Sequence, residues 1–170
     1  MTAAASLFLA DEEATLRLGQ MMAQTLPQGW GLAVALLRGP LGSGKTTLTR
    51  GFVAALPGGG QAQVASPSFN LVNIYPCRPQ VAHLDLYRLG TGGFDAGLEE
   101  FLEPPLDQTR RVVLVEWAQY LPEDLLPWDY LTMDWRESGA GREITLTAKG
   151  REASAWLESI QRNMSKSGLS

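Results

Sequence analysis

The chain contains two kinds of hydrophobic pattern, uninterrupted apolar runs and apolar residues at helical spacing. The runs at residues 32–37 and 112–115 contain no polar member, which predicts short strands buried on both faces. In residues 11–26, 46–56 and 151–163 the apolar residues recur at spacings of three and four, which predicts amphipathic helices. Strands that alternate with helices favour an α/β fold with a mainly parallel sheet and helices on both faces.

The remaining patterned stretches predict shorter elements. We expect a first strand at residues 6–9, extended segments at 71–75 and 81–88, and a short helix at 94–101. In a strand over 81–88, the side chains of His83, Asp85 and Tyr87 would lie on one face. Residues 130–135 and 144–148 alternate around a glycine-rich turn, which predicts a hairpin that adds an antiparallel edge to the sheet.

Length and composition narrow the class of protein. The 170 residues suit a single domain, which we place at residues 1–164, with a frayed tail at 165–170. No apolar run has the length of a membrane span, and the N-terminus lacks the pattern of a signal peptide. A single cysteine, Cys77, fits a reducing cytoplasm. The net charge of −4 argues against a broad surface that binds nucleic acid on its own.

A glycine-rich motif follows the apolar run at 32–37. It has the form G-x-x-x-x-G-K-T and extends from Gly39 to Thr46. Its glycines permit backbone angles that a Cβ would forbid, so the loop N–H groups can surround phosphate oxygens. Lys45 would carry charge to the terminal phosphates, and the Thr46 hydroxyl is the usual ligand for Mg²⁺. With a strand before it and a helix after it, the motif predicts the phosphate loop of a P-loop nucleoside triphosphatase.

Two acidic residues at the ends of predicted strands are candidates for the chemistry beside this loop. Glu116 follows the run at 112–115, where it can hold Mg²⁺ or orient the attacking water. Asp85 is a second candidate metal ligand or an anchor for one. The hydroxyls of Ser66-Pro67-Ser68 would sense the last phosphate. For His83, a structural role and a functional role are both open.

Three classes of function are compatible with these residues. A motif N-K-x-D that would read guanine is absent, which favours ATP over GTP. The first hypothesis is an ATPase. The second is a small-molecule kinase on the same scaffold, although the segment at residues 90–93 carries no arginine for a mobile lid. The third is a binding module that uses nucleotide as a switch, which would leave Glu116 and Asp85 idle.

Several motifs together resemble the TsaE (YjeE) family of ATPases over about residues 11–143. Beyond the phosphate loop, the resemblance rests on S-P-S-F-N-L-V from Ser66, H-L-D-L-Y-R-L from His83, G-L-E-E-F from Gly97 and L-V-E-W from Leu114. Ser68 stands where threonine is usual in the family, which preserves the hydroxyl. Ala118 replaces a common proline after the E-W pair.

The resemblance implies a Mg²⁺-dependent ATPase of the machinery that makes threonylcarbamoyladenosine in tRNA. In that family the protein acts with the TsaD–TsaB pair and supports its turnover, so contact with tRNA would be through the complex. Hydrolysis by the chain alone would be weak, because the chain supplies no obvious arginine finger; Arg88 is the best internal candidate.

The family's motifs also imply a set of site residues. Those implied to contact nucleotide are Glu12, Leu41, Gly42, Ser43, Gly44, Lys45, Thr46, Thr47, Ser68, Trp117 and Arg142. The catalytic set is Lys45, Asp85 and Glu116, and the Mg²⁺ ligands are Thr46, Asp85 and Glu116.

Overall fold

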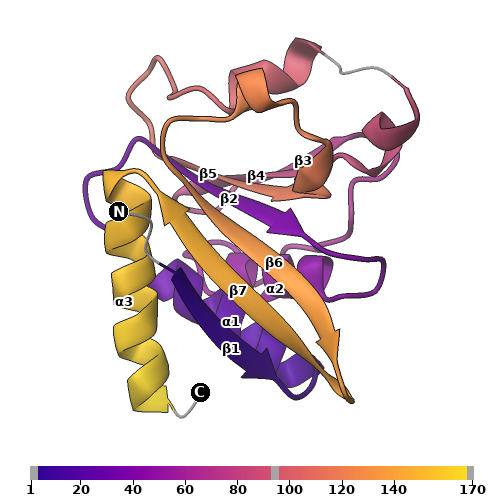
Figure 1. The fold of residues 1–170 in the computed structure, drawn as a ribbon. Helices are drawn as coiled ribbons and strands as arrows, with labels where there is room; N and C mark the ends of the chain where they lie inside the picture. The colour runs from indigo at the N-terminus through magenta and orange to yellow at the C-terminus, as the bar shows by residue number, and fades with distance from the viewer. Residues whose placement is uncertain (1–3, 93–95, 168–170) are drawn as a thin grey trace.

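The computed structural model describes residues 4–92 and 96–167, which are built around one mixed sheet of seven strands (Figure 1). The order of strands across it is β1-β7-β6-β2-β5-β4-β3. Their bounds are β1 Ala4–Leu9, β2 Leu32–Arg38, β3 Val72–Tyr75, β4 Gln80–Asp85, β5 Arg111–Glu116, β6 Tyr130–Ser138 and β7 Gly141–Lys149.

The centre of the sheet is parallel and its flanks are antiparallel. Strand β2 pairs in parallel with β5 and β6, and β5 pairs in parallel with β4. The hairpin β6–β7 was expected at the edge, but β1 pairs antiparallel with β7 from Ala4 to Leu9 and forms the edge itself. The first strand thereby covers N–H and C=O groups that β7 would otherwise expose.

Helices cover the two faces of the sheet unequally. The α-helices α1 Glu12–Gln24, α2 Lys45–Ala54 and α3 Arg151–Ser167 pack on one face and share a single apolar core with it. The other face is covered by four 3₁₀ helices among the described residues, which gather near the top of Figure 1. They are η1 Tyr87–Thr91, η2 Ala96–Phe101, η3 Ala118–Tyr120 and η4 Glu123–Leu125. The predicted α/β fold with helices on both faces is confirmed.

Glycines allow α1 and α2 to pack with their backbones in close approach. A Cβ added to Gly19 would lie 2.1 Å from the carbonyl oxygen of Leu48, and one added to Gly51 would lie 2.2 Å from that of Leu16. The start of α1 is fixed by Asp11, whose Oδ1 accepts the N–H of Ala14 at 2.8 Å. The close approach of the two backbones at Gly19 and Gly51 sets the position of α1 beside the loop that precedes α2.

Several predicted elements have different bounds in the structure, and two of these differences change the position assigned to a side chain. Strand β4 ends at Asp85, because the Asp85 carboxylate accepts the N–H of Tyr87 at 2.9 Å and the chain turns into η1; Tyr87 therefore does not share a strand face with His83. Helix α3 continues to Ser167, beyond the predicted end at 163, since Met164 extends its buried stripe.

Two predicted segments fall partly outside the residues that the structure describes, and a third prediction concerns membrane-spanning helices. Residues 94 and 95 of the helix predicted at 94–101 lie outside the described residues, and the described part is the 3₁₀ helix η2. Residues 168–170 of the predicted tail lie outside them as well. No helix within residues 4–92 and 96–167 is long and apolar enough to cross a membrane.

Candidate nucleotide site

The loop between β2 and α2 adopts an open, glycine-dependent conformation. Gly42 and Gly44 have φ of +74° and +109°, in the left-handed region that side chains rarely adopt. Gly44 is the N-cap of α2 and offers no side chain to the first N–H groups of that helix. These N–H groups and the positive end of the helix dipole are therefore available to an anion.

Lys45 is buried at the base of this loop. Its Nζ donates hydrogen bonds to the carbonyl oxygens of Gly39 and Pro40, both at 2.8 Å, and to Ser43 Oγ at 3.3 Å. Burial lowers the pKa of the ammonium, while the charges of Glu116 and Asp85 act to raise it. The ammonium thus lies among polar atoms that a phosphate oxygen can replace as hydrogen-bond partners.

Glu116 joins the loop to the neighbouring strands. The Thr46 hydroxyl donates to Glu116 Oε1 at 2.7 Å, across 70 positions of sequence. The same carboxylate oxygen lies 2.8 Å from His83 Nε2, and Tyr75 Oη lies 3.3 Å from His83 Nδ1. Because β4 and β5 are parallel and adjacent, His83 near the end of β4 and Glu116 at the end of β5 lie at the same edge of the sheet, beside the loop.

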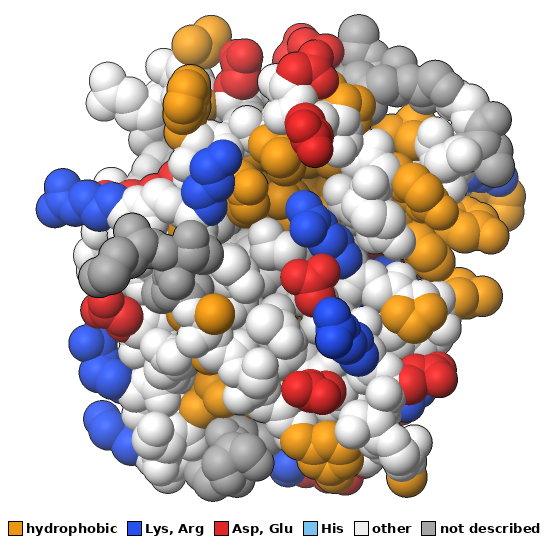
Figure 2. All heavy atoms as spheres, viewed as in Figure 1, with side chains coloured by type: hydrophobic (Ala, Val, Ile, Leu, Met, Phe, Trp, Pro, Cys, Tyr) orange, Lys and Arg blue, Asp and Glu red, His pale blue; other side chains and the backbone are white. Residues whose placement is uncertain are grey.

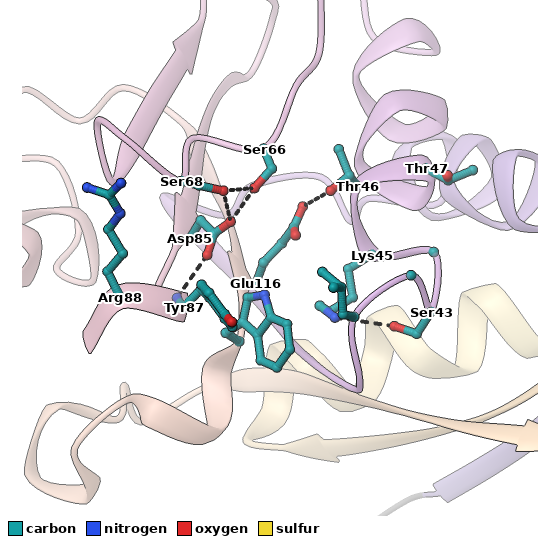
Figure 3. Close-up of a pocket in the computed structure, with 14 residues that line it drawn as sticks. Ser43, Lys45, Thr46, Thr47, Ser66, Ser68, Asp85, Tyr87, Arg88 and Glu116 are labelled. Carbon is teal, nitrogen blue, oxygen red and sulfur yellow. Dashed lines mark hydrogen bonds between the residues drawn. The ribbon is translucent and has the colours of Figure 1, made fainter. Parts of the chain in front are cut away.

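Asp85 is the centre of a second group of polar contacts. Its carboxylate accepts hydrogen bonds from Ser66 and from Ser68, the latter at 3.1 Å, in addition to the N–H of Tyr87. The two serine hydroxyls lie 2.9 Å apart. The segment between α2 and β3 is thereby held against the end of β4, with both hydroxyls directed toward the same cavity (Figure 3).

A cavity of about 470 Å³ joins these groups. The loop residues line one side, and Asp85 and Tyr87 lie across the cavity from them (Figure 3). Glu116 and Trp117 line the cavity as well. Trp117 has φ of +56°, unusual for a bulky side chain, and its ring centroid lies 4.2 Å from Lys45 Nζ. A backbone held in this region at a cavity wall is typical of a functional position.

The residues present fit a nucleotide phosphate with Mg²⁺. The described residues hold no group of three or more His, Cys, Asp or Glu that could bind a metal by themselves. Magnesium beside a phosphate loop does not need one, because it takes a hydroxyl, a carboxylate, phosphate oxygens and water. Thr46 and Glu116 supply the hydroxyl and the carboxylate, and Asp85 lines the same cavity.

A second cavity of about 290 Å³ lies on the other side of the loop. It is lined by the start of α1, including Glu12 and Thr15, and by Arg142 near the start of β7. Arg142 Nη2 lies 3.5 Å from the carbonyl oxygen of Gly42, and Glu12 lies 3.5 Å from the guanidinium of Arg50. Glu12 and Arg142, distant in sequence, therefore line the same cavity beside the loop.

The structure brings the expected site residues together at these two cavities. Leu41, Gly42, Ser43, Gly44, Lys45, Thr46, Thr47, Ser68, Asp85, Glu116 and Trp117 line the first, and Glu12 and Arg142 line the second. Their roles toward nucleotide and metal stay predictions.

Four further residues contact or line the site outside the set that the family resemblance implied. The hydroxyl of Ser66 contacts Asp85 as directly as that of Ser68, and the shared S-P-S motif was the available signal. Buried His83 contacts Glu116, although a lone histidine gives no signal of its partner. Tyr87 lines the first cavity because its strand ends early, and Thr15 lines the second from a buried face of α1.

Comparisons with known proteins place this arrangement in a family. The model of the family described as "Threonylcarbamoyl adenosine biosynthesis protein TsaE" matches residues 9–144. A protein of Nostoc sp. named tRNA threonylcarbamoyladenosine biosynthesis protein TsaE is 39% identical over 118 residues, which are 68% of this chain and 69% of that one. The protein of the same name from Bacillus subtilis is 36% identical over 132 residues, 76% of this chain and 78% of the relative.

A solved structure agrees with the sequence comparisons. The crystal structure of YdiB from Bacillus subtilis superposes with a TM-score of 0.74 at 27% identity, covering 96% of this chain and 97% of YdiB. The match of the family model extends from the last residue of β1 into β7, so it includes both cavities. The chain belongs to the TsaE family of threonylcarbamoyl adenosine biosynthesis proteins.

Proposed function

We propose that this protein is a Mg²⁺-dependent ATPase required for the formation of threonylcarbamoyladenosine in tRNA, and that it acts with a TsaD–TsaB pair. Membership of the TsaE family supports the pathway. The observation that carries the ATPase assignment is the 2.7 Å contact between the Thr46 hydroxyl and Glu116 at the mouth of the phosphate loop. A simple phosphate-binding loop would not need an acidic partner at this position.

The chain's own residues divide the chemistry among them. The loop N–H groups and the ammonium of Lys45 hold the phosphates. The ammonium does so by exchanging its hydrogen bonds to the carbonyl oxygens of Gly39 and Pro40 for hydrogen bonds to phosphate oxygens. When bound, Mg²⁺ would neutralise charge on the terminal phosphates, and Thr46 with Glu116 would hold it. Asp85 keeps Ser66 and Ser68 close to the position of the last phosphate.

Hydrolysis adds a water oxygen to the terminal phosphorus and breaks its bond to the bridging oxygen of ADP. The free carboxylate oxygen of Glu116 would orient this water and accept its proton, while Oε1 stays with Thr46 and His83. Trp117 and Tyr87 line the cavity with their ring centroids 4.9 Å apart, and these two rings limit entry of other water.

Exposed side chains beside this cavity support the proposed dependence on a partner. Arg88, the internal candidate for an arginine finger, lies with its guanidinium 4.7 Å from the ring of Phe69, which is itself 83% exposed. Leu41 is 82% exposed on the loop side. A partner that covers these side chains would exclude water and change the position of Arg88, which would accelerate hydrolysis.

The test is ATP hydrolysis by the pure protein, alone and with TsaD and TsaB. We expect slow hydrolysis alone and strong stimulation by the pair, and loss of both with Glu116→Gln while ATP still binds. Binding of ATP with no stimulation by the pair would refute the proposed partnership. Hydrolysis by Glu116→Gln at the rate of the unchanged protein would refute the role of Glu116.

A further inference from the structure

A third cavity, larger than the two beside the phosphate loop, lies at the other end of the sheet. It measures about 740 Å³ and is lined by Gly31 and Leu32, by residues from 99 to 106, and by residues 124–129. Leu32 begins β2 and the phosphate loop follows its end, so the two cavities are separated by a strand length of about 20 Å. We call this third cavity the distal groove. The proposed ATPase function makes no use of it.

The distal groove has an unusually exposed apolar lining. Trp128 is 93% exposed and Leu106 is 103% exposed, on two different segments that face the same groove. Between them, Leu102, Leu125 and Leu126 are buried or partly buried against the core of this face of the sheet. A large aromatic and a large aliphatic side chain that project from a rigid apolar floor are typical of a surface that a partner covers.

The rim of the distal groove carries unpaired negative charge. The carboxylates of Glu99, Glu103 and Asp124 are exposed and form no hydrogen bond or ion pair with any residue that the structure describes. A fourth acid, Asp129, is already used, since it accepts the N–H groups of Glu152 and Ala153 at the start of α3.

Nearby basic residues do not neutralise this rim. No Lys or Arg is among the described residues that line the groove. Arg111, at the same end of the sheet, lies over the ring of Phe101 and contacts Gln80. Figure 2 shows acidic and hydrophobic side chains near the top of the view, in the region of the 3₁₀ helices in Figure 1, with Lys or Arg side chains beside and below the hydrophobic ones.

We propose that the distal groove docks a basic amphipathic segment of a partner protein, with apolar side chains packed on Trp128 and Leu106 and Lys or Arg side chains paired with the acidic rim. Complementary charge gives such a segment both attraction and orientation. The same charge repels nucleic acid phosphates. A second copy of this chain is disfavoured as the occupant, because its net charge is also negative, at −4.

The experiment measures binding of a fluorescein-labelled synthetic helical peptide, with leucines at spacings of three and four and lysines elsewhere, by fluorescence anisotropy. The control peptide has glutamate in place of every lysine. Two double variants perturb the groove, Trp128→Ser with Leu106→Ser and Glu103→Lys with Asp124→Lys. The matched control variants, Ile74→Ser and Glu158→Lys, change exposed side chains elsewhere on the surface. Circular dichroism verifies that each variant is folded.

We expect the lysine peptide to bind, the glutamate peptide not to bind, and each groove variant to raise Kd by about tenfold or more, as loss of central contacts does at interfaces. The control variants should bind the lysine peptide like the unchanged protein. The proposal is overturned if the lysine peptide does not bind, if both peptides bind equally, or if groove and control variants behave alike. If sedimentation shows a dimer that the Trp128→Ser substitution dissociates, the occupant of the groove is a second copy of this chain, and the proposal of a basic partner segment is overturned.

Discussion

Replacing His83 with leucine tests the chain of buried contacts that ends at Glu116. His83 is fully buried and contacts Glu116 Oε1 through Nε2 at 2.8 Å and Tyr75 Oη through Nδ1 at 3.3 Å. Leucine has a similar volume, so the substitution removes both polar contacts and leaves little cavity. Glu116 Oε1 then keeps the Thr46 hydroxyl as a partner, and Tyr75 Oη keeps its 3.5 Å contact with the carbonyl oxygen of Ala65.

The cost can be worked out from these two contacts. A hydrogen bond to a charged group and a second, neutral one together contribute about 2–4 kcal/mol to the free energy of unfolding. For a chain of this length, that loss lowers the melting temperature by about 4–16 °C. Tyr75→Phe removes one neutral contact and should cost only about 0.5–1.5 kcal/mol.

Thermal unfolding followed by circular dichroism measures the stability, and steady-state ATP hydrolysis with TsaD and TsaB measures the effect on Glu116. We expect His83→Leu to lower kcat by about 10–100-fold, since a displaced catalytic group loses that much. His83→Gln, which keeps an amide donor, should recover part of both losses. If His83→Leu unfolds and turns over like the unchanged protein, His83 does not position Glu116.

Three further predictions concern other parts of the molecule. Gly51→Ala should destabilise the protein by about 1–3 kcal/mol in urea unfolding, because its Cβ would collide with the Leu16 carbonyl, whereas Gly60→Ala, in open space, should not. Arg142→Ala should weaken ATP binding in calorimetry by about three- to tenfold, through loss of a cation beside the loop, with little change in unfolding; an unchanged Kd would remove Arg142 from the nucleotide site. Because burial lowers the pKa of Lys45, ATP affinity should begin to fall, as pH rises, at a lower pH than an ordinary lysine would give. Between the lowered pKa of Lys45 in the folded protein and the ordinary pKa of lysine, the unfolded chain binds more protons than the folded, nucleotide-free protein, so the free energy of unfolding should rise with pH. Calorimetric titrations measure the ATP affinity, and unfolding titrations measure the stability.

Local patterns were sufficient for the central elements of the fold. The apolar run that became β2, the glycine loop and the helix after it are encoded within a few neighbouring residues, and the structure has each of them. Edge strands are different, because pairing between β1 and β7 joins residues such as Ala4 and Thr147 that no local pattern connects. Periodicity therefore predicted the strands but not which of them forms the edge.

The site divides in the same way between local and distant signals. Glu116 could be placed beside the loop because strand ends in parallel sheets meet at one edge. Asp85 was expected near a strand end, but the turn that takes Tyr87 out of the strand was not predicted, since it depends on one hydrogen bond from the Tyr87 N–H to the Asp85 side chain. Glu12 and Arg142 came only from the family resemblance, and the structure places both on one cavity through long-range packing.

The most direct test of the proposed function is threonylcarbamoyladenosine formation on tRNA by TsaD and TsaB over many turnovers, with this protein or its Glu116→Gln variant added. We expect repeated turnover with the unchanged protein and ATP, and arrested turnover with the variant, which keeps the phosphate loop intact. Equal product with the variant, or equal product with no protein added, would contradict the proposal that hydrolysis at this site supports the modification.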